Sequence, residues 1–109
     1  MIIASRTLTY LAASVRQDVR IDIFKPEEDN GSWLCHYVIN WPDQPWRSFG
    51  GGHDAVQALL AAMQKIGIEL YASHANTSGQ LFWDDWKGFG FPVPKAARAE
   101  LIGDDAKFL

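Results

Sequence analysis

Apolar and polar residues alternate along two stretches near the N-terminus. Residues 2–11 are rich in β-branched and aromatic side chains, and residues 15–24 alternate, with Ile21 and Ile23 on one side and Asp22 on the other. Strict alternation is typical of a strand with one face toward a core. The pattern therefore predicts two β-strands.

A third alternating stretch, residues 33–41, follows a polar turn over residues 26–32. It places five large side chains on one face: Trp33, Cys35, Tyr37, Ile39 and Trp41. Pro42 and Pro45 then predict a turn, since proline cannot donate to a sheet ladder, and residues 46–49 can return as a fourth strand. All these connections are too short for a parallel crossover, so the pattern predicts an antiparallel meander.

The periodicity changes after residues 50–52, three glycines that we expect to break the sheet. Asp54 and Gln57 have the spacing of a capping box, and a three-four spacing of apolar residues predicts a helix over residues 54–73. The predicted core stripe is Val56, Leu59, Leu60, Met63, Ile66 and Leu70. Gly67 costs about 1 kcal/mol in a helix interior, but the stripe stays in phase across it, so we expect one continuous helix.

The C-terminal third has weaker signals. Residues 80–84 are predicted as a short strand, residues 88–94 as extended chain, and residues 95–102 as a short helix that ends before Gly103. The predicted fold class is α+β, a four-stranded antiparallel meander with one main helix on one face, plus a C-terminal strand segment and short helix. We expect a single domain over residues 1–109.

Charge and cysteine content narrow the function classes. The 109 residues carry 10 Lys and Arg against 13 Asp and Glu, a net charge of -3, which argues against a nucleic-acid-binding module. The lone Cys35 excludes an intrachain disulfide and suits a reducing cytosol. We find no signal peptide and no apolar run near the roughly 18 residues that span a bilayer, so we expect a cytoplasmic protein without membrane contact.

Several short motifs together resemble a family of small bacterial domains of unknown function. They occupy residues 33–37, 41–43, 54–59, 79–83 and 90–94. The resemblance covers nearly the whole chain and implies a bacterial, single-domain protein. It carries over no activity, cofactor or catalytic residue.

The glycine turn before the helix is the first candidate site. Free N–H groups at a helix N-terminus bind anions, so Gly51, Gly52 and the nearby Arg47 are candidates for holding a phosphate or carboxylate. The simpler interpretation is that Asp54 caps these donors. His53 is a further ligand candidate, and with Ser48 it would form a hydrolase pair, but the strained elbow that exposes a serine nucleophile is missing.

Arg6 and His36 are the other candidate ligand-binding residues. Arg6 lies on the same strand face as Leu8, and we expect its side chain to extend past the sheet edge, with a buried ion pair or a pocket as alternatives. His36 points away from its neighbour Cys35. No metal site and no cofactor are predicted, because the histidines do not converge.

Aromatic residues are abundant, with five Trp and six Phe. Four of them in the C-terminal third are candidates for a partner interface or a stacking platform: Trp83, Trp86, Phe89 and Phe91. Trp46, in the predicted fourth strand, is a further candidate for such stacking or anchoring. Alternatively, the C-terminal segment wraps back and uses them to seal the core.

Two function classes follow. The first is a non-catalytic cytosolic interaction or binding module that binds a protein partner or forms a homodimer. The second is a small ligand-binding protein or enzyme with a site around Arg6, His36 and the turn over residues 50–54. Self-association is expected because the sheet face opposite the helix mixes Phe24, Leu34 and Val38 with polar residues.

Overall fold

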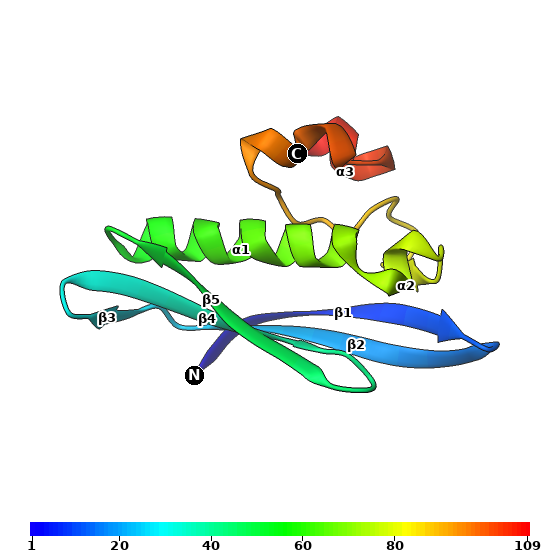
Figure 1. The fold of residues 1–109 in the computed structure, drawn as a ribbon, viewed down its shortest axis with the longest axis horizontal. Coiled ribbons are helices and arrows are strands. Elements are labelled where there is room, and N and C mark those ends of the chain that lie inside the picture. Colours follow the sequence, from blue (N-terminus) through cyan, green and yellow to red (C-terminus); the bar gives the residue numbers. More distant parts are fainter.

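Four long strands follow one another as an antiparallel meander. In the computed structural model, which describes residues 1–109, they are β1 (Ile2–Ala12), β2 (Val15–Phe24), β4 (Ser32–Asn40) and β5 (Pro45–Gly52) (Figure 1). Each pairs with the next, β1 with β2, β2 with β4 and β4 with β5. The four-stranded meander predicted from alternation is confirmed.

Two short strands extend this sheet. β3 (Glu27–Asp29) pairs with the start of β4, within the stretch predicted as a turn. β6 (Leu81–Phe82) pairs with β1 beside Thr9 and Tyr10, where a short strand was predicted. The sheet therefore has six strands, and the reversal between β3 and β4 is confined to Asn30 and Gly31, both at positive φ.

The main helix, α1 (Ala55–Ala72), begins and continues as predicted. The Asp54 side chain accepts a hydrogen bond from the Gln57 backbone N–H at 2.8 Å, and the Gln57 side chain accepts one from the His53 N–H at 2.5 Å. This reciprocal pairing satisfies donors that a helix N-terminus leaves free. The helix runs through Gly67 without interruption.

The three glycines after Phe49 do not break the sheet, which corrects the sequence prediction. They are the last residues of β5 and pair with residues of β4: Cys35, Leu34 and Trp33. A Cβ atom on Gly52 would lie 2.5 Å from the backbone nitrogen of Ala58, and one on Gly50 would overlap the backbone of Ala62. These two glycines let α1 lie directly on the sheet.

This close approach also changes which helix residues face the core. The buried positions are Ala58, Ala62, Ile66, Gly67 and Leu70. Val56 is 75% exposed and Leu60 45% exposed, so the predicted stripe was wrong at these two positions. Ala58 and Ala62 lie opposite Gly52 and Gly50, where larger side chains would hold the helix away from β5, and Ile66 and Leu70 fill the inner face further along.

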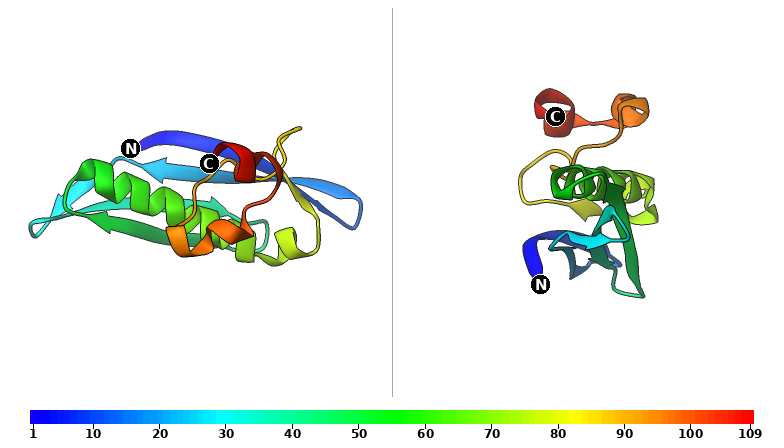
Figure 2. Two further views of the ribbon diagram at one scale, coloured as in Figure 1. Left: turned by 90° about the horizontal axis from the view of Figure 1, so that it is seen from above. Right: turned by 90° about the vertical axis from the view of Figure 1, so that its left-hand side faces the viewer.

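The C-terminal segment forms a third layer on the far side of α1 (Figure 2). After α2 (His74–Thr77) and β6, the chain passes α1 and continues into η1 (Lys95–Glu100) and α3 (Gly103–Phe108). The helix predicted over residues 95–102 is thus a shorter 3-10 helix, and Gly103 begins a further helix. At the crossing a Cβ atom on Gly67 would overlap the Pro92 carbonyl oxygen, so this helix surface is also closely packed.

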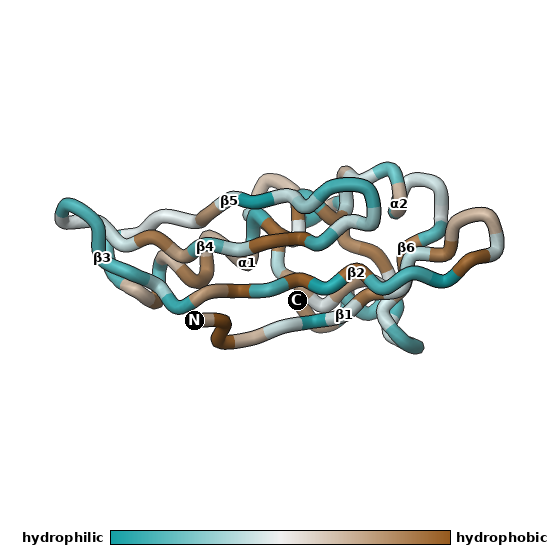
Figure 3. The backbone as a smooth tube through the Cα atoms, turned by 90° about the horizontal axis from the view of Figure 1, so that it is seen from below, coloured by the Kyte–Doolittle hydropathy of each residue, from teal (hydrophilic) through white to brown (hydrophobic).

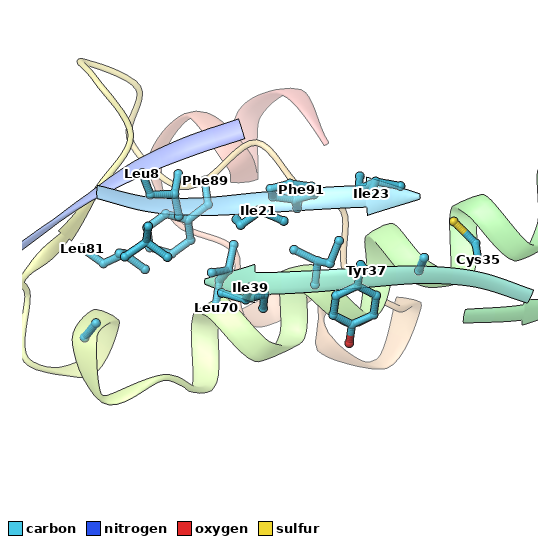
Figure 4. Close-up of a cluster of buried hydrophobic side chains, with 14 of the residues drawn as sticks. Leu8, Ile21, Ile23, Cys35, Tyr37, Ile39, Leu70, Leu81, Phe89 and Phe91 are labelled. Carbon is cyan, nitrogen blue, oxygen red and sulfur yellow. The ribbon is translucent and has the colours of Figure 1, made fainter. Parts of the chain in front are cut away.

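The core lies between the sheet and α1 and is completed by the C-terminal segment (Figure 4). Cys35 and Ile39 of β4 are fully buried there, and Phe89 and Phe91 enter from the C-terminal segment. The Cys35 thiol donates to the Phe24 carbonyl oxygen at 3.3 Å. Burial raises the pKa of this thiol, which disfavours the reactive thiolate.

A buried carboxylate holds the third layer in place. Asp105 of α3 is fully buried and accepts four hydrogen bonds. The donors are the Tyr71 hydroxyl at 2.5 Å, the Trp86 indole N–H at 2.7 Å, and the backbone N–H groups of Phe89 and Gly90 at 2.8 Å each. Burial, and after it the Asp105 carboxylate, raise the pKa of Tyr71. One side chain therefore joins α1, α3 and the loop between them.

Gly50→Ala is expected to lower the free energy of unfolding by about 2 kcal/mol or more. The new methyl group would overlap the backbone of α1, and that backbone can move away only if the whole helix shifts from the sheet. Gly51→Ala is the matched control. Gly51 faces away from α1, with no atom closer than 3.9 Å to its Cβ position, so a change within about 0.5 kcal/mol is expected. Urea denaturation measures both variants, and equal midpoints would contradict the close approach.

Asp105→Asn is expected to destabilise the protein by about 3 kcal/mol. Three of the partners are N–H groups that can only donate, so the new amide NH2 group must face at least one of them however it is turned: Phe89 on one side, or Trp86 and Gly90 on the other. Asp85→Asn, at an exposed carboxylate that makes no hydrogen bond, is the control. Denaturant unfolding followed by tryptophan fluorescence tests this, and an Asp105→Asn midpoint equal to that of the control would argue against the role of Asp105.

Candidate functional site

Arg6 and His36 lie on opposite faces of the sheet. Arg6 is paired with the buried Ile21 and points to the α1 side. His36 is paired with Phe49 and points to the other side, where their rings contact each other with centroids 5.6 Å apart. A site that uses Arg6 and His36 together is therefore not formed.

The Arg6 guanidinium is enclosed by aromatic rings and does not extend past the sheet edge, which corrects the prediction. Its Cζ lies 3.8 Å from the centroid of the Trp83 ring and 4.7 Å from that of Phe91, and its Nη1 donates to the Phe89 carbonyl oxygen at 3.0 Å. Burial lowers the pKa of Arg6, and the charge of Asp105 opposes this. The residue fastens the C-terminal segment to β1 through cation–π contacts.

The four aromatic residues predicted for an interface are engaged inside the molecule. Phe89 and Phe91 are buried in the core, so they are not available to a partner and the prediction is corrected for these two rings. Trp83 and Trp86 are half-buried; Trp83 lies against Arg6, and Trp86 donates to the Asp105 carboxylate. The alternative, that the segment wraps back and seals the core, is confirmed.

The glycine turn does not form an anion cradle. Gly51 and Gly52 belong to β5, and the N–H groups of His53 and Gln57 are occupied by the capping box described above. Arg47 lies on the opposite sheet face from α1, since it is paired with Val38. The capping interpretation of Asp54 is therefore correct.

The sheet face opposite α1 is covered by no other element, and we call it the open face. In the end-on view of Figure 2 the helices all lie on the other side of the sheet. Figure 3 shows this face from below, with hydrophobic and hydrophilic stretches along β5, β4, β2 and β1. The register places alternate residues of each strand on it, Asp22 and Val38 among them.

One part of the open face is a polar network around Asp22, which is only 4% exposed. Asp22 accepts from the Ser5 hydroxyl at 2.7 Å and from the Asn40 amide at 3.2 Å, and it forms an ion pair with Arg20 at 2.9 Å. Burial alone would raise the pKa of Asp22, but these hydrogen bonds and the Arg20 charge outweigh it and hold the pKa below its ordinary value.

The other part is a shallow hollow of about 400 Å³ between β2, β4 and β5. Its lining combines apolar and basic side chains with one carboxylate: Met1, Phe24, Lys25, Glu27, His36, Arg47 and Phe49. The structure thus brings His36 and Arg47 together here. Phe49, which is 44% exposed, was not singled out from the sequence, although its strand parity with Arg47 was available as a signal.

The structure does not bring together the residues that the sequence suggested for a hydrolase or a metal site. The Ser48 hydroxyl accepts from the Lys65 ammonium at 3.1 Å, so Ser48 is engaged with a lysine and not with His53. No group of three His, Cys, Asp or Glu side chains is placed to hold a metal ion. No helix is both long enough and apolar enough to cross a bilayer.

Comparison with known families finds one match. Residues 4–93 match the family described as Domain of unknown function (DUF6968), and the chain belongs to that family. The matched segment covers the sheet, α1 and the loop that contacts Arg6, and ends before α3. No curated protein and no solved structure matches the chain.

The Asp22 network predicts an acid-dependent loss of stability. Because the folded-state pKa lies below the unfolded value, Asp22 stabilises the fold fully above about pH 5 and loses this effect as the pH falls through about 4 and below. The advantage of the native chain over Asp22→Asn should therefore shrink between pH 5 and pH 3. Asp18→Asn on the same strand face, where the carboxylate makes no hydrogen bond, is the control. An advantage independent of pH in urea titrations would contradict the network.

Proposed function

We propose that the protein is a non-catalytic interaction module that self-associates through the open face of its sheet. The observation that carries this proposal is the hollow beside Phe49 on a sheet face that no helix covers. Exposed apolar patches rimmed by polar groups are typical of protein interfaces. A sheet face of this kind is buried when a second sheet packs against it at about 10 Å.

The charges on the open face favour a second copy as the occupant. Along β2, Arg16, Asp18, Arg20 and Asp22 alternate in sign on this face. Asp22 is already paired with Arg20 within the chain, which leaves Arg16 and Asp18. In a two-fold symmetric pairing each face meets itself, so Arg16 of one copy can lie against Asp18 of the other. A face of one sign would repel its own copy.

Other properties of the molecule support an intracellular module. The single thiol is buried and hydrogen-bonded, as a reducing compartment permits, so we place the protein in the bacterial cytoplasm. The enzyme alternative receives no support from the geometry, because Arg6, His36 and the residue 50–54 turn are separated. Binding through the open face requires no catalytic group.

Multi-angle light scattering on the full chain at micromolar concentration tests the proposal. The expected mass is about 24 kDa, twice the 12.2 kDa of one chain. Phe49→Arg should return the protein to the single-chain mass. The substitution replaces an apolar ring of the interface with a positive charge, and when two such faces meet this charge is repelled by the Arg47 side chains that line the same hollow.

Val56→Arg is the matched control, since Val56 is 75% exposed on α1, away from the open face. It should leave the mass unchanged. A native chain that stays at 12.2 kDa up to high micromolar concentration rejects self-association. Dissociation by Val56→Arg and not by Phe49→Arg would move the interface to α1.

A further inference from the structure

A second depression lies at the end of the molecule where α1 stops. It is a groove of about 650 Å³, and we call it the terminal groove. The β4–β5 turn over residues 41–46 forms one wall, and the last turn of α1 with the start of α2 forms the other. In Figure 1 the first wall is the turn at the lower right, below the β2 label, and the second wall is the α2 region above it.

Three aromatic rings line the terminal groove: Tyr10, Trp41 and Trp46. Trp41 is half-buried and packs against the core, which fixes one wall, while Trp46 is 47% exposed. None of the three takes part in the ring–ring or cation–ring contacts that engage Trp83 and Trp86. Trp46 therefore offers much of its ring to a ligand, whereas Tyr10 and Trp41, which pack against the core, offer only part of theirs.

The charges of the terminal groove have one sign. Asp43 and Glu69 contribute two carboxylates and His74 an imidazole, and the lining contains neither Lys nor Arg. Glu69 is half-buried and has no hydrogen-bond or ion-pair partner, and Asp43 accepts only from the Gln44 backbone N–H at 3.0 Å. A partly desolvated carboxylate without a partner is unfavourable unless a cation approaches it.

We infer that the terminal groove binds an alkylammonium group, with its carbon chain against Trp41 and Trp46 and its charge beside Glu69 and Asp43. Aromatic faces attract cations through their negative quadrupole, and carboxylates add charge-assisted hydrogen bonds. The same chemistry is offered by a free amine and by a lysine side chain of a protein. The inference concerns a different surface from the open face and stands independently of self-association.

An anion is a poor occupant, because both ionised side chains would repel it. A neutral sugar could lie on the rings but would leave the Glu69 charge uncompensated. Charge complementarity therefore selects the cation among ligands that use aromatic walls.

NMR titration of the full chain tests the inference through the indole N–H signals of Trp41 and Trp46. Butylammonium is the probe, and butanol, butyrate and cellobiose are the comparison ligands. Butylammonium should shift both signals saturably, with a dissociation constant at least about tenfold below those of the three comparison ligands. A Gly-Lys-Gly peptide with blocked ends presents the same ammonium group on a peptide. Tighter binding of the peptide than of butylammonium identifies a protein lysine as the source, and equal or weaker binding identifies a free amine.

Glu69→Gln keeps the shape of the groove and removes one charge, so it should raise the dissociation constant for butylammonium about tenfold. Asp43→Asn, at an exposed turn position, is a second variant; the amide oxygen can still accept from the Gln44 N–H, so the fold should be kept and binding should weaken in the same direction. Glu100→Gln, on η1 outside the groove, is the control and should change nothing. Circular dichroism on each variant verifies that it is folded.

Three results would overturn the inference. Butanol or cellobiose binding as tightly as butylammonium would show that the charge is not recognised. Unchanged affinity in both Glu69→Gln and Asp43→Asn would show that the carboxylates are not contacts. Shifts confined to Trp83 and Trp86 would place the amine elsewhere.

Discussion

The distance between α1 and the sheet is the constraint on which the rest of the structure depends. Gly50 and Gly52 carry no side chain toward the helix. On the helix side, the small residues Ala62 and Ala58 pack against them. Backbone therefore lies almost against backbone, and α1 is packed on its outer side too, where Gly67 meets Pro92. Because interiors are packed at near-crystalline density, a single methyl group at these points cannot be absorbed locally. The glycine run that resembled a ligand cradle in the sequence is instead the surface on which the helix rests.

A helix held this close shields only part of the sheet, and the C-terminal segment supplies the remaining cover. Asp105 accepts hydrogen bonds from one donor of α1 and three donors of the loop before η1, and Arg6 binds the same loop to β1 through two rings. Asp105 lies beyond the segment that matches the family, yet its donors lie within it. Since Phe89 and Phe91 are used on the α1 side, nothing in the chain remains to cover the opposite sheet face. The open face is thus a consequence of how the core is completed.

The two proposed surfaces differ in chemistry because they differ in origin. The open face is an exposed sheet surface, with interspersed charges of both signs and a shallow apolar hollow, which suits a broad contact with another protein surface. The terminal groove lies between the end of α1 and the β4–β5 turn. It is larger, about 650 Å³ against about 400 Å³, is lined by aromatic rings, and its charged side chains are the carboxylates Asp43 and Glu69. A surface of mixed charge favours self-association, whereas a groove of one charge favours a small group of the opposite charge.

The sequence by itself determined the elements with strong local signals: the four alternating strands, the proline turn, and the helix with its Asp54 and Gln57 cap. It also determined that Cys35, Tyr37 and Ile39 share the buried face, because strand parity is a local property. The helix periodicity placed Ile66 and Leu70 on the buried side of α1, but tertiary structure alone decided that Ala58 and Ala62 lie there as well, because that depends on Gly50 and Gly52 in another element. It also decided the partner of Arg6 and the role of Asp105, whose contacts join residues 83 and 34 positions apart along the chain. A pattern of neighbouring residues cannot indicate contacts between residues so far apart in the chain. The open face and the terminal groove are formed by the same long-range packing, so the sequence could not indicate them either.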